Sequence, residues 1–152
     1  MLYLVQHGEA KPEDVDPERN LTKKGRSDVL RVAAYVAGLN SSLKQIRHSG
    51  KTRAMQTASI LADHLARGYR PESADGLGPM DDPRIWADRL RSIEEDIMLV
   101  GHLPHLARLA ALLLCGDPTR NVINFSMGGM VCVSRRGPDW GIDWIVTPGV
   151  VP

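Results

Sequence analysis

Short runs of apolar residues alternate along the chain with longer segments in which apolar residues recur every three or four positions. The first pattern is typical of buried strands, and the second is typical of amphipathic helices. Strands are expected at 2–5, 45–48, 97–100, 129–134 and 141–146. Helices are expected at 22–37, 49–67, 85–93 and 103–114, and a loop rich in proline and glycine is expected at 69–83.

The order of these elements predicts the fold class. Strands and helices alternate through the first two thirds of the chain, and two further strands follow. This order favours an α/β three-layer sandwich, with a mostly parallel central sheet flanked by helices on both faces. The sequence has no internal repeat, and its 152 residues suit a single domain over 1–152.

Composition and charge exclude several classes of partner. The chain has 19 basic and 18 acidic residues, so we expect no general attraction to nucleic acid or to an anionic membrane. The longest apolar run, 109–115, is too short to span a bilayer. Cys115 and Cys132 lack the spacing of a metal or redox site, and we interpret them as partly buried core thiols. A cytoplasmic location is therefore expected.

Polar residues follow three of the expected strands. Gln6-His7-Gly8 follows the first strand, His48-Ser49 follows the second, and Gly101-His102 follows the strand at 97–100. In open α/β sheets, ligands bind outside the carboxyl ends of the strands. This convergence predicts the functional site.

Two of these histidines and a nearby arginine suit the binding of an anion. His7 could attack phosphorus while a backbone carbonyl fixes its other ring nitrogen, and Gly8 would let the chain turn closely around a ligand. Arg53 lies one turn into a helix that Ser49 would cap, and its guanidinium can bind two phosphoryl oxygens. His102 repeats the arrangement of His7. Each residue alone also fits a structural role, as a hydrogen-bonded histidine or a solvated arginine.

Four segments resemble, in order, the motifs of the histidine phosphatase superfamily. The resemblance is closest to the compact phosphohistidine phosphatase branch, because the chain is short and its last motif reads Gly-His-Leu-Pro. It implies a phosphoglycerate mutase-like fold. The segments are Leu-Val-Gln-His-Gly-Glu-Ala at 4–10, Leu-Thr-Lys-Lys-Gly at 21–25, Ser-Gly-Lys-Thr-Arg-Ala-Met-Gln-Thr-Ala at 49–58 and Val-Gly-His-Leu-Pro at 100–104.

This resemblance implies a chemistry. His7 would be the nucleophile that accepts the phosphoryl group, while Gln6, Arg53 and a protonated His102 would help to hold it. Water would then release inorganic phosphate. The family needs no metal or other cofactor, and a protein carrying phosphohistidine is the expected substrate.

Gln6 departs from the family, in which an arginine precedes the first histidine. Loss of a charge-assisted contact would cost about 1.5–3 kcal/mol of phosphate binding. Lys11, Arg19 and Lys51 are the cations that could compensate. A non-catalytic phosphoryl-binding module therefore stays an alternative.

The general acid is a second open question. A small-molecule phosphomonoesterase, the other alternative, would need a carboxylic acid to protonate its leaving oxygen. Glu72, Asp75, Asp81 and Asp82 are the candidates, and Asp82 is preferred. The compact branch lacks this acid, which suits phosphohistidine because protonated imidazole leaves without help. Little sequence separates the motifs, so an open site suited to a protein substrate is expected.

The remaining histidines and the tryptophans have simpler interpretations. His102 and His105 could form a metal pair, but no third ligand is apparent, so His105 is expected at the site rim or on the helix surface. His64 is expected to face solvent. Trp86, Trp140 and Trp144 are expected to pack in or against the core, because no basic stripe accompanies them.

Overall fold

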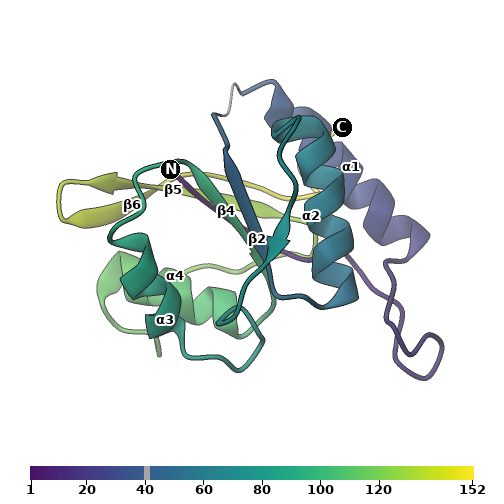
Figure 1. The fold of residues 1–152 in the computed structure, drawn as a ribbon, viewed down its shortest axis with the longest axis horizontal. Helices are drawn as coiled ribbons and strands as arrows, with labels where there is room; N and C mark the ends of the chain where they lie inside the picture. Colours follow the sequence, from purple (N-terminus) through teal and green to yellow (C-terminus); the bar gives the residue numbers. More distant parts are fainter. Residues whose placement is uncertain (40–41) are drawn as a thin grey trace.

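The computed structural model describes residues 1–39 and 42–152 (Figure 1). Every helix and strand expected from the sequence is present, with small shifts at the ends. The strands are β1 (Leu2–Gln6), β2 (Gln45–His48), β3 (Glu72–Ser73), β4 (Ile97–Gly101), β5 (Met130–Arg136) and β6 (Asp139–Val146). The helices are α1 (Lys23–Ala37), α2 (Thr52–Leu65), α3 (Pro83–Leu90) and α4 (His105–Cys115). The short strand β3, within the expected loop 69–83, is an addition.

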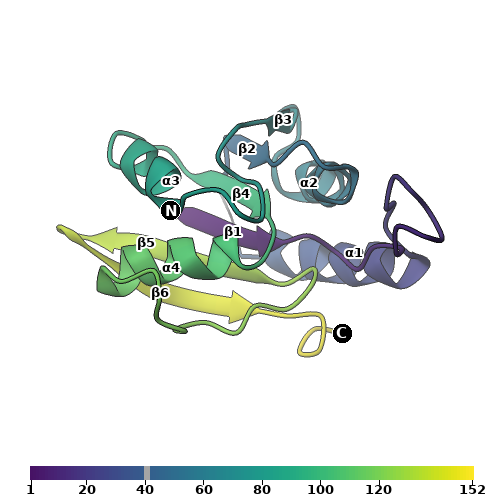
Figure 2. The same cartoon turned by 90° about the horizontal axis from the view of Figure 1, so that it is seen from below.

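One sheet contains all six strands, in the order β3-β2-β4-β1-β5-β6. The first four are parallel to one another, and β5 is antiparallel to both β1 and β6. Crossover helices join the parallel strands, whereas a tight turn at 137–138 joins β5 to β6 (Figure 2). Helices α1 and α2 lie on one face, and α3 and α4 lie on the other (Figure 1). The expected three-layer α/β sandwich with a mostly parallel sheet is confirmed.

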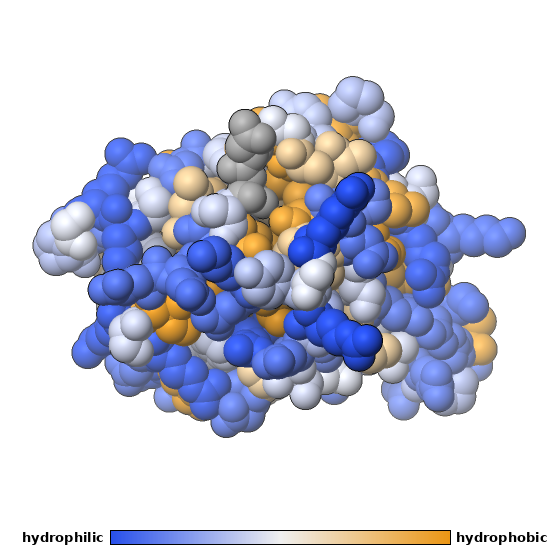
Figure 3. All heavy atoms as spheres, turned by 45° about the horizontal axis from the view of Figure 1, so that its top comes forward, coloured by the Kyte–Doolittle hydropathy of each residue, from blue (hydrophilic) through white to orange (hydrophobic). Residues whose placement is uncertain are grey.

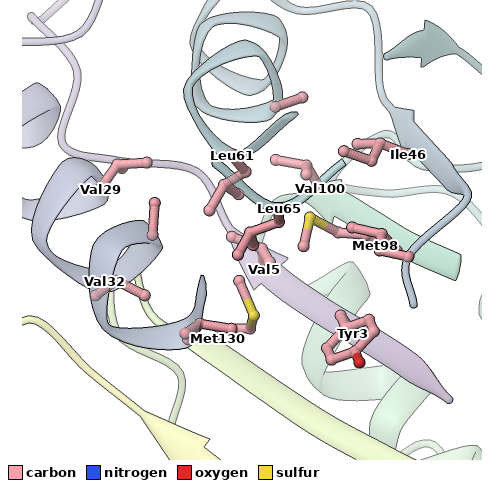
Figure 4. Close-up of a cluster of buried hydrophobic side chains, with 14 of the residues drawn as sticks. Tyr3, Val5, Val29, Val32, Ile46, Leu61, Leu65, Met98, Val100 and Met130 are labelled. Atoms are coloured by element: carbon pink, nitrogen blue, oxygen red, sulfur yellow. The ribbon is translucent and has the colours of Figure 1, made fainter. Parts of the chain in front are cut away.

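Strand β1 is buried along its whole length because both faces of the sheet are covered. Its side chains alternate between the two faces, as the period of a strand requires. Leu2 and Leu4 join the core under α3 and α4. Tyr3 and Val5 join the core under α1 and α2, where Leu61 of α2 also lies (Figure 4). This packing fixes the direction in which β1 delivers the residues that follow it.

Helix α2 begins later than the sequence predicted. Lys51 takes the N-cap position without a side-chain hydrogen bond, so the expectation that Ser49 caps this helix is wrong. The buried stripe of α2 follows Ala54, Ala58 and Leu61. Met55 is 43% exposed because it lies one position, about 100° of helical turn, away from Ala54.

The surface drawn in Figure 3 is predominantly hydrophilic, with smaller apolar areas between charged side chains. Within 1–39 and 42–152, no helix is long and apolar enough to cross a membrane. Cys132 lies in the core as expected. The same expectation is wrong for Cys115, which is exposed because it is the last residue of α4.

Candidate active site

Strands β1, β2 and β4 end at the same edge of the sheet. Gln6 pairs with Gly101 and His48 with Val100, so the residues after each strand emerge side by side. The ring centroids of His7 and His102 are 4.9 Å apart, with an angle of 52° between the ring planes. The predicted convergence of polar residues at this edge is what the structure shows.

His7 is held in one orientation by hydrogen bonds on both ring nitrogens. Its Nδ1 lies 2.7 Å from the carbonyl oxygen of Gly8, and the Nε of Arg53 lies 3.3 Å from its Nε2. A carbonyl oxygen can only accept, so Nδ1 carries the hydrogen and Nε2 carries the lone pair. The nitrogen that faces Arg53 is therefore the nucleophilic one.

The surroundings of both histidines favour their neutral forms. Burial lowers the pKa of His7; the hydrogen bond to Gly8 opposes this effect, and the charge of Arg53 adds to it. The pKa of His102 is lowered to about 3, mainly by burial and then by the charges of His7, Arg53 and Lys51. His102 is therefore expected to be neutral in the protein without an anion, and its protonation beside a bound phosphoryl group stays a prediction.

Ser49 orients His102. The Oγ of Ser49 lies 2.6 Å from the Nε2 of His102, at the turn where Gly50 adopts a φ of +86°. The Nδ1 of His102 is buried and has no protein partner. An unpaired buried nitrogen is costly, so this atom marks a place where a bound group would be stabilised.

Gly8 serves packing rather than ligand approach. A Cβ atom at Gly8 would lie 2.9 Å from Val29 Cγ2 and 3.1 Å from the carbonyl oxygen of Gly25, both in α1. The amide of Gly8 donates to Thr57 Oγ1 at 2.9 Å, and Thr57 in turn donates to the carbonyl of Arg53 at 2.8 Å. Thr57 thereby links the loop after β1 to α2. Its spacing of four residues from Arg53 was the signal that could have revealed it.

Gln6 is buried at this edge, and its Oε1 has no hydrogen-bond partner. The charge of Arg19 contributes, after burial, to lowering the pKa values of His7 and Arg53, and that of Lys51 acts on His102. Of the three cations proposed to compensate for Gln6, Arg19 and Lys51 therefore place their charge near the site.

Arg19 is fixed by its own loop. Its φ is +52°, unusual for a residue other than glycine, and its Nε donates to the carbonyl of Lys11 at 3.1 Å. The loop is anchored to α2 by Gln56, which accepts from the amide of Leu21 at 2.8 Å and donates to Asn20 Oδ1 at 2.6 Å. This anchoring holds the Arg19 loop beside the helix that carries Arg53.

The four candidate acids all have structural partners. None of their hydrogen bonds or ion pairs involves His7, Arg53 or His102, so the role of Asp82 as a general acid stays a prediction. Glu72 forms an ion pair with Arg47, and Asp75 forms one with Arg89 at 3.0 Å. Asp81 accepts a hydrogen bond from the amide of Gly78 at 2.7 Å, and Asp82 accepts one from the amide of Arg84 at 2.9 Å.

His105 is fully buried, and neither of its ring nitrogens has a partner. The expectation that it lies at the site rim or on the helix surface is wrong, because the first turn of α4 packs inward. His64 is exposed as expected, Trp86 is in the core, and Trp140 and Trp144 pack against it. Within 1–39 and 42–152, no group of three or more metal-ligating side chains is suitably placed to hold a metal ion.

Sequence similarity relates this chain to a known protein. No model of a known protein family matches the sequence. An uncharacterised protein of Picosynechococcus sp. is 31% identical over 137 residues, which cover 86% of this chain and 82% of that protein. The two proteins therefore belong to one family.

Solved structures show which fold this is. The protein histidine phosphatase SixA complexed with tungstate is similar with a TM-score of 0.86 and 21% identity, over 97% of both chains. Phosphoserine phosphatase of Entamoeba histolytica has a TM-score of 0.70 and 15% identity over 95% of both chains. Mycobacterial glucosyl-3-phosphoglycerate phosphatase has a TM-score of 0.70 and 16% identity, over 94% of this chain and 97% of that one. This chain therefore has the same fold as these phosphatases.

Proposed function

We propose that this protein is a metal-independent phosphatase that uses His7 as its nucleophile and acts on phosphohistidine in a protein. The observation that carries the proposal is the state of His7 Nε2. This nitrogen holds the lone pair, because Nδ1 donates to Gly8, and it lies beside the Arg53 guanidinium. A neutral, oriented imidazole next to a fixed cation suits attack on a phosphoryl group.

The reaction divides into two transfers. The lone pair of His7 Nε2 forms a bond to phosphorus while the P–N bond to the substrate imidazole breaks, and that imidazole leaves neutral if its other nitrogen is protonated. Water then attacks the phosphorus on His7, both of its hydrogens stay with the product as dihydrogen phosphate, and neutral His7 is restored. Neither step needs a metal to balance.

Arg53 and His102 would stabilise the phosphoryl oxygens. The Arg53 guanidinium can bind two oxygens, and the unpaired His102 Nδ1 needs a hydrogen-bond partner. A doubly negative phosphoryl group beside His102 would raise the pKa of its ring, so proton uptake would accompany binding. Arg19 would supply the positive charge that Gln6 lacks.

Two features favour phosphohistidine over a phosphate ester. The four candidate carboxylates serve as ion-pair or hydrogen-bond partners elsewhere, and a P–N bond to protonated imidazole breaks without a general acid. The similar SixA structure is also that of a protein histidine phosphatase. A phosphate ester of an alcohol would require a general acid, and none of the four carboxylates forms a hydrogen bond or ion pair with His7, Arg53 or His102.

Trapping of the intermediate tests the proposal. The protein is incubated with radiolabelled phosphoramidate, quenched in alkali and digested, and acid-labile label is expected on the peptide that contains His7. His7→Ala should remove both the label and the release of phosphate while the circular dichroism spectrum is retained. Tungstate binding without label or phosphate release from any donor would instead indicate the phosphoryl-binding module.

A further inference from the structure

A groove of about 610 Å³ lies beside the proposed active site. The loop before α3, the first turns of α4 and the segment that follows α4 form its walls. Pro104 lines it and is only two residues from His102, and Leu103 between them is 39% exposed. The volume is within the range of ligand-binding clefts. Pro104 therefore places the groove next to the loop that carries His102.

Some of the charged side chains that line the groove have ion-pair partners, and others have none. Asp81 binds the amide of Gly78, and Asp82 caps α3 and pairs with Arg84 at 3.6 Å. Arg120 pairs with Asp117 at 3.7 Å. Among the charged residues that line the groove in the described chain, Asp81 and Arg108 have no ion-pair partner, and only Arg108 also lacks a side-chain hydrogen bond.

Much of the rest of the lining is apolar, and Thr119 and Asn121 are polar. Met80 is 72% exposed, and Pro83, Pro104, Ala107 and Pro118 contribute further apolar surface. Proline side chains lose little conformational entropy when a partner covers them. An apolar surface with one unpaired guanidinium suits an extended peptide segment that contains a carboxylate.

We propose that this groove binds an acidic segment that flanks the phosphohistidine of the protein substrate, and that Arg108 pairs with its carboxylate. This inference rests on the proposed function. The phosphohistidine ring enters the site at His7, and the neighbouring backbone lies across Pro104 into the groove. This contact provides specificity for the substrate protein.

The test compares three phosphohistidine donors: a short peptide with glutamates beside the phosphohistidine, the same peptide with glutamines, and free phosphohistidine. The wild-type protein should have a KM about fivefold lower for the glutamate peptide than for the glutamine peptide, as one partly desolvated ion pair provides. Arg108→Glu should abolish or reverse this preference, while kcat and the KM for free phosphohistidine stay unchanged. Ala107→Trp, which fills the groove, should raise the KM for both peptides.

Arg26→Glu is the matched control. Arg26 is an exposed arginine of α1, on the opposite face of the sheet, and it forms no ion pair with any described residue. A peptide preference that Arg108→Glu changes no more than Arg26→Glu would overturn the inference, as would an equal loss with free phosphohistidine. Failure of the wild-type protein to release phosphate from free phosphohistidine would overturn the proposed function itself, and the inference with it.

Discussion

The Nε of Arg53 points at the Nε2 of His7 from 3.3 Å, so a guanidinium donates to the one ring nitrogen that has a free lone pair. In this arrangement the lone pair of His7 Nε2 accepts a hydrogen bond from Arg53. A bound anion would draw the guanidinium to the anion's oxygens and so free the lone pair. The substrate would thus release the nucleophile that attacks it. The same contact helps to keep His7 neutral, because the charge of Arg53 lowers its pKa after burial has done so.

Arg19 is expected to replace the cation that Gln6 lacks. Arg19→Gln should weaken tungstate binding by about tenfold, the effect of one charge-assisted contact, and adding Gln6→Arg should restore most of that affinity. Isothermal titration calorimetry of the single and double variants measures the coupling between the two positions. Lys11→Gln is the control, because only its backbone carbonyl contacts Arg19. Equal affinities for wild type and Arg19→Gln would contradict this prediction.

Ser49 is expected to act by positioning His102 and not by folding the chain. Ser49→Ala removes the 2.6 Å hydrogen bond to His102 Nε2 and should lower kcat about fivefold, with less change in KM. Ser49→Thr keeps the hydroxyl and should recover most of the rate. Steady-state kinetics with free phosphohistidine, together with thermal unfolding, separate the two effects. A loss of stability with unchanged kcat would show that Ser49 is merely structural.

Acid should destabilise the protein through His102. Its pKa is about 3 in the folded protein, against 6.5 for an unperturbed histidine, so the unfolded chain binds more protons between these two pH values. This contribution to the free energy of unfolding is complete above pH 6.5, declines as the pH falls, and is lost as it passes through about 3. Urea unfolding at a series of pH values should therefore show a steep acid slope.

His102→Asn should flatten that slope, whereas His64→Asn, on the exposed surface of α2, should leave it unchanged. If both variants showed the wild-type slope, the result would contradict the burial of a neutral His102.

In the same pH range kcat/KM should fall only below pH 6.5, because the pKa of His7 is lowered from that value and its neutral form is the nucleophile.

Asp82 allows the roles of cap and acid to be separated. Asparagine caps helices as well as aspartate does but cannot protonate a leaving group. We expect Asp82→Asn to hydrolyse free phosphohistidine and 4-nitrophenyl phosphate at the wild-type rates. Asp82→Ala should lower the free energy of unfolding by about 1 kcal/mol through loss of the bond to the Arg84 amide. A large, selective loss of ester hydrolysis in Asp82→Asn would assign the acid to this residue.

The sequence by itself was sufficient for the order of elements and for the edge at which the site lies. Apolar runs such as 97–100 identify buried strands, because a strand covered on both faces carries mostly apolar side chains. Parallel strands end together, so the polar residues that follow β1, β2 and β4 had to meet. The motifs then identified His7, Arg53 and His102 as candidate site residues from the sequence alone.

Only the tertiary structure decided the electrostatic state of those residues and the contacts of their neighbours. Burial depends on what packs around a side chain, and it makes His102 neutral and encloses His105 completely. A serine can cap a helix or bond to a histidine, so the residue type alone does not identify the partner of Ser49. The turn at Gly50 places its hydroxyl beside His102. Arg19 is distant from His7 in sequence, and its charge reaches the site only because Gln56 anchors its loop to α2. Local patterns encode periodicity and chain direction, whereas desolvation and long-range pairing arise when separate segments pack together.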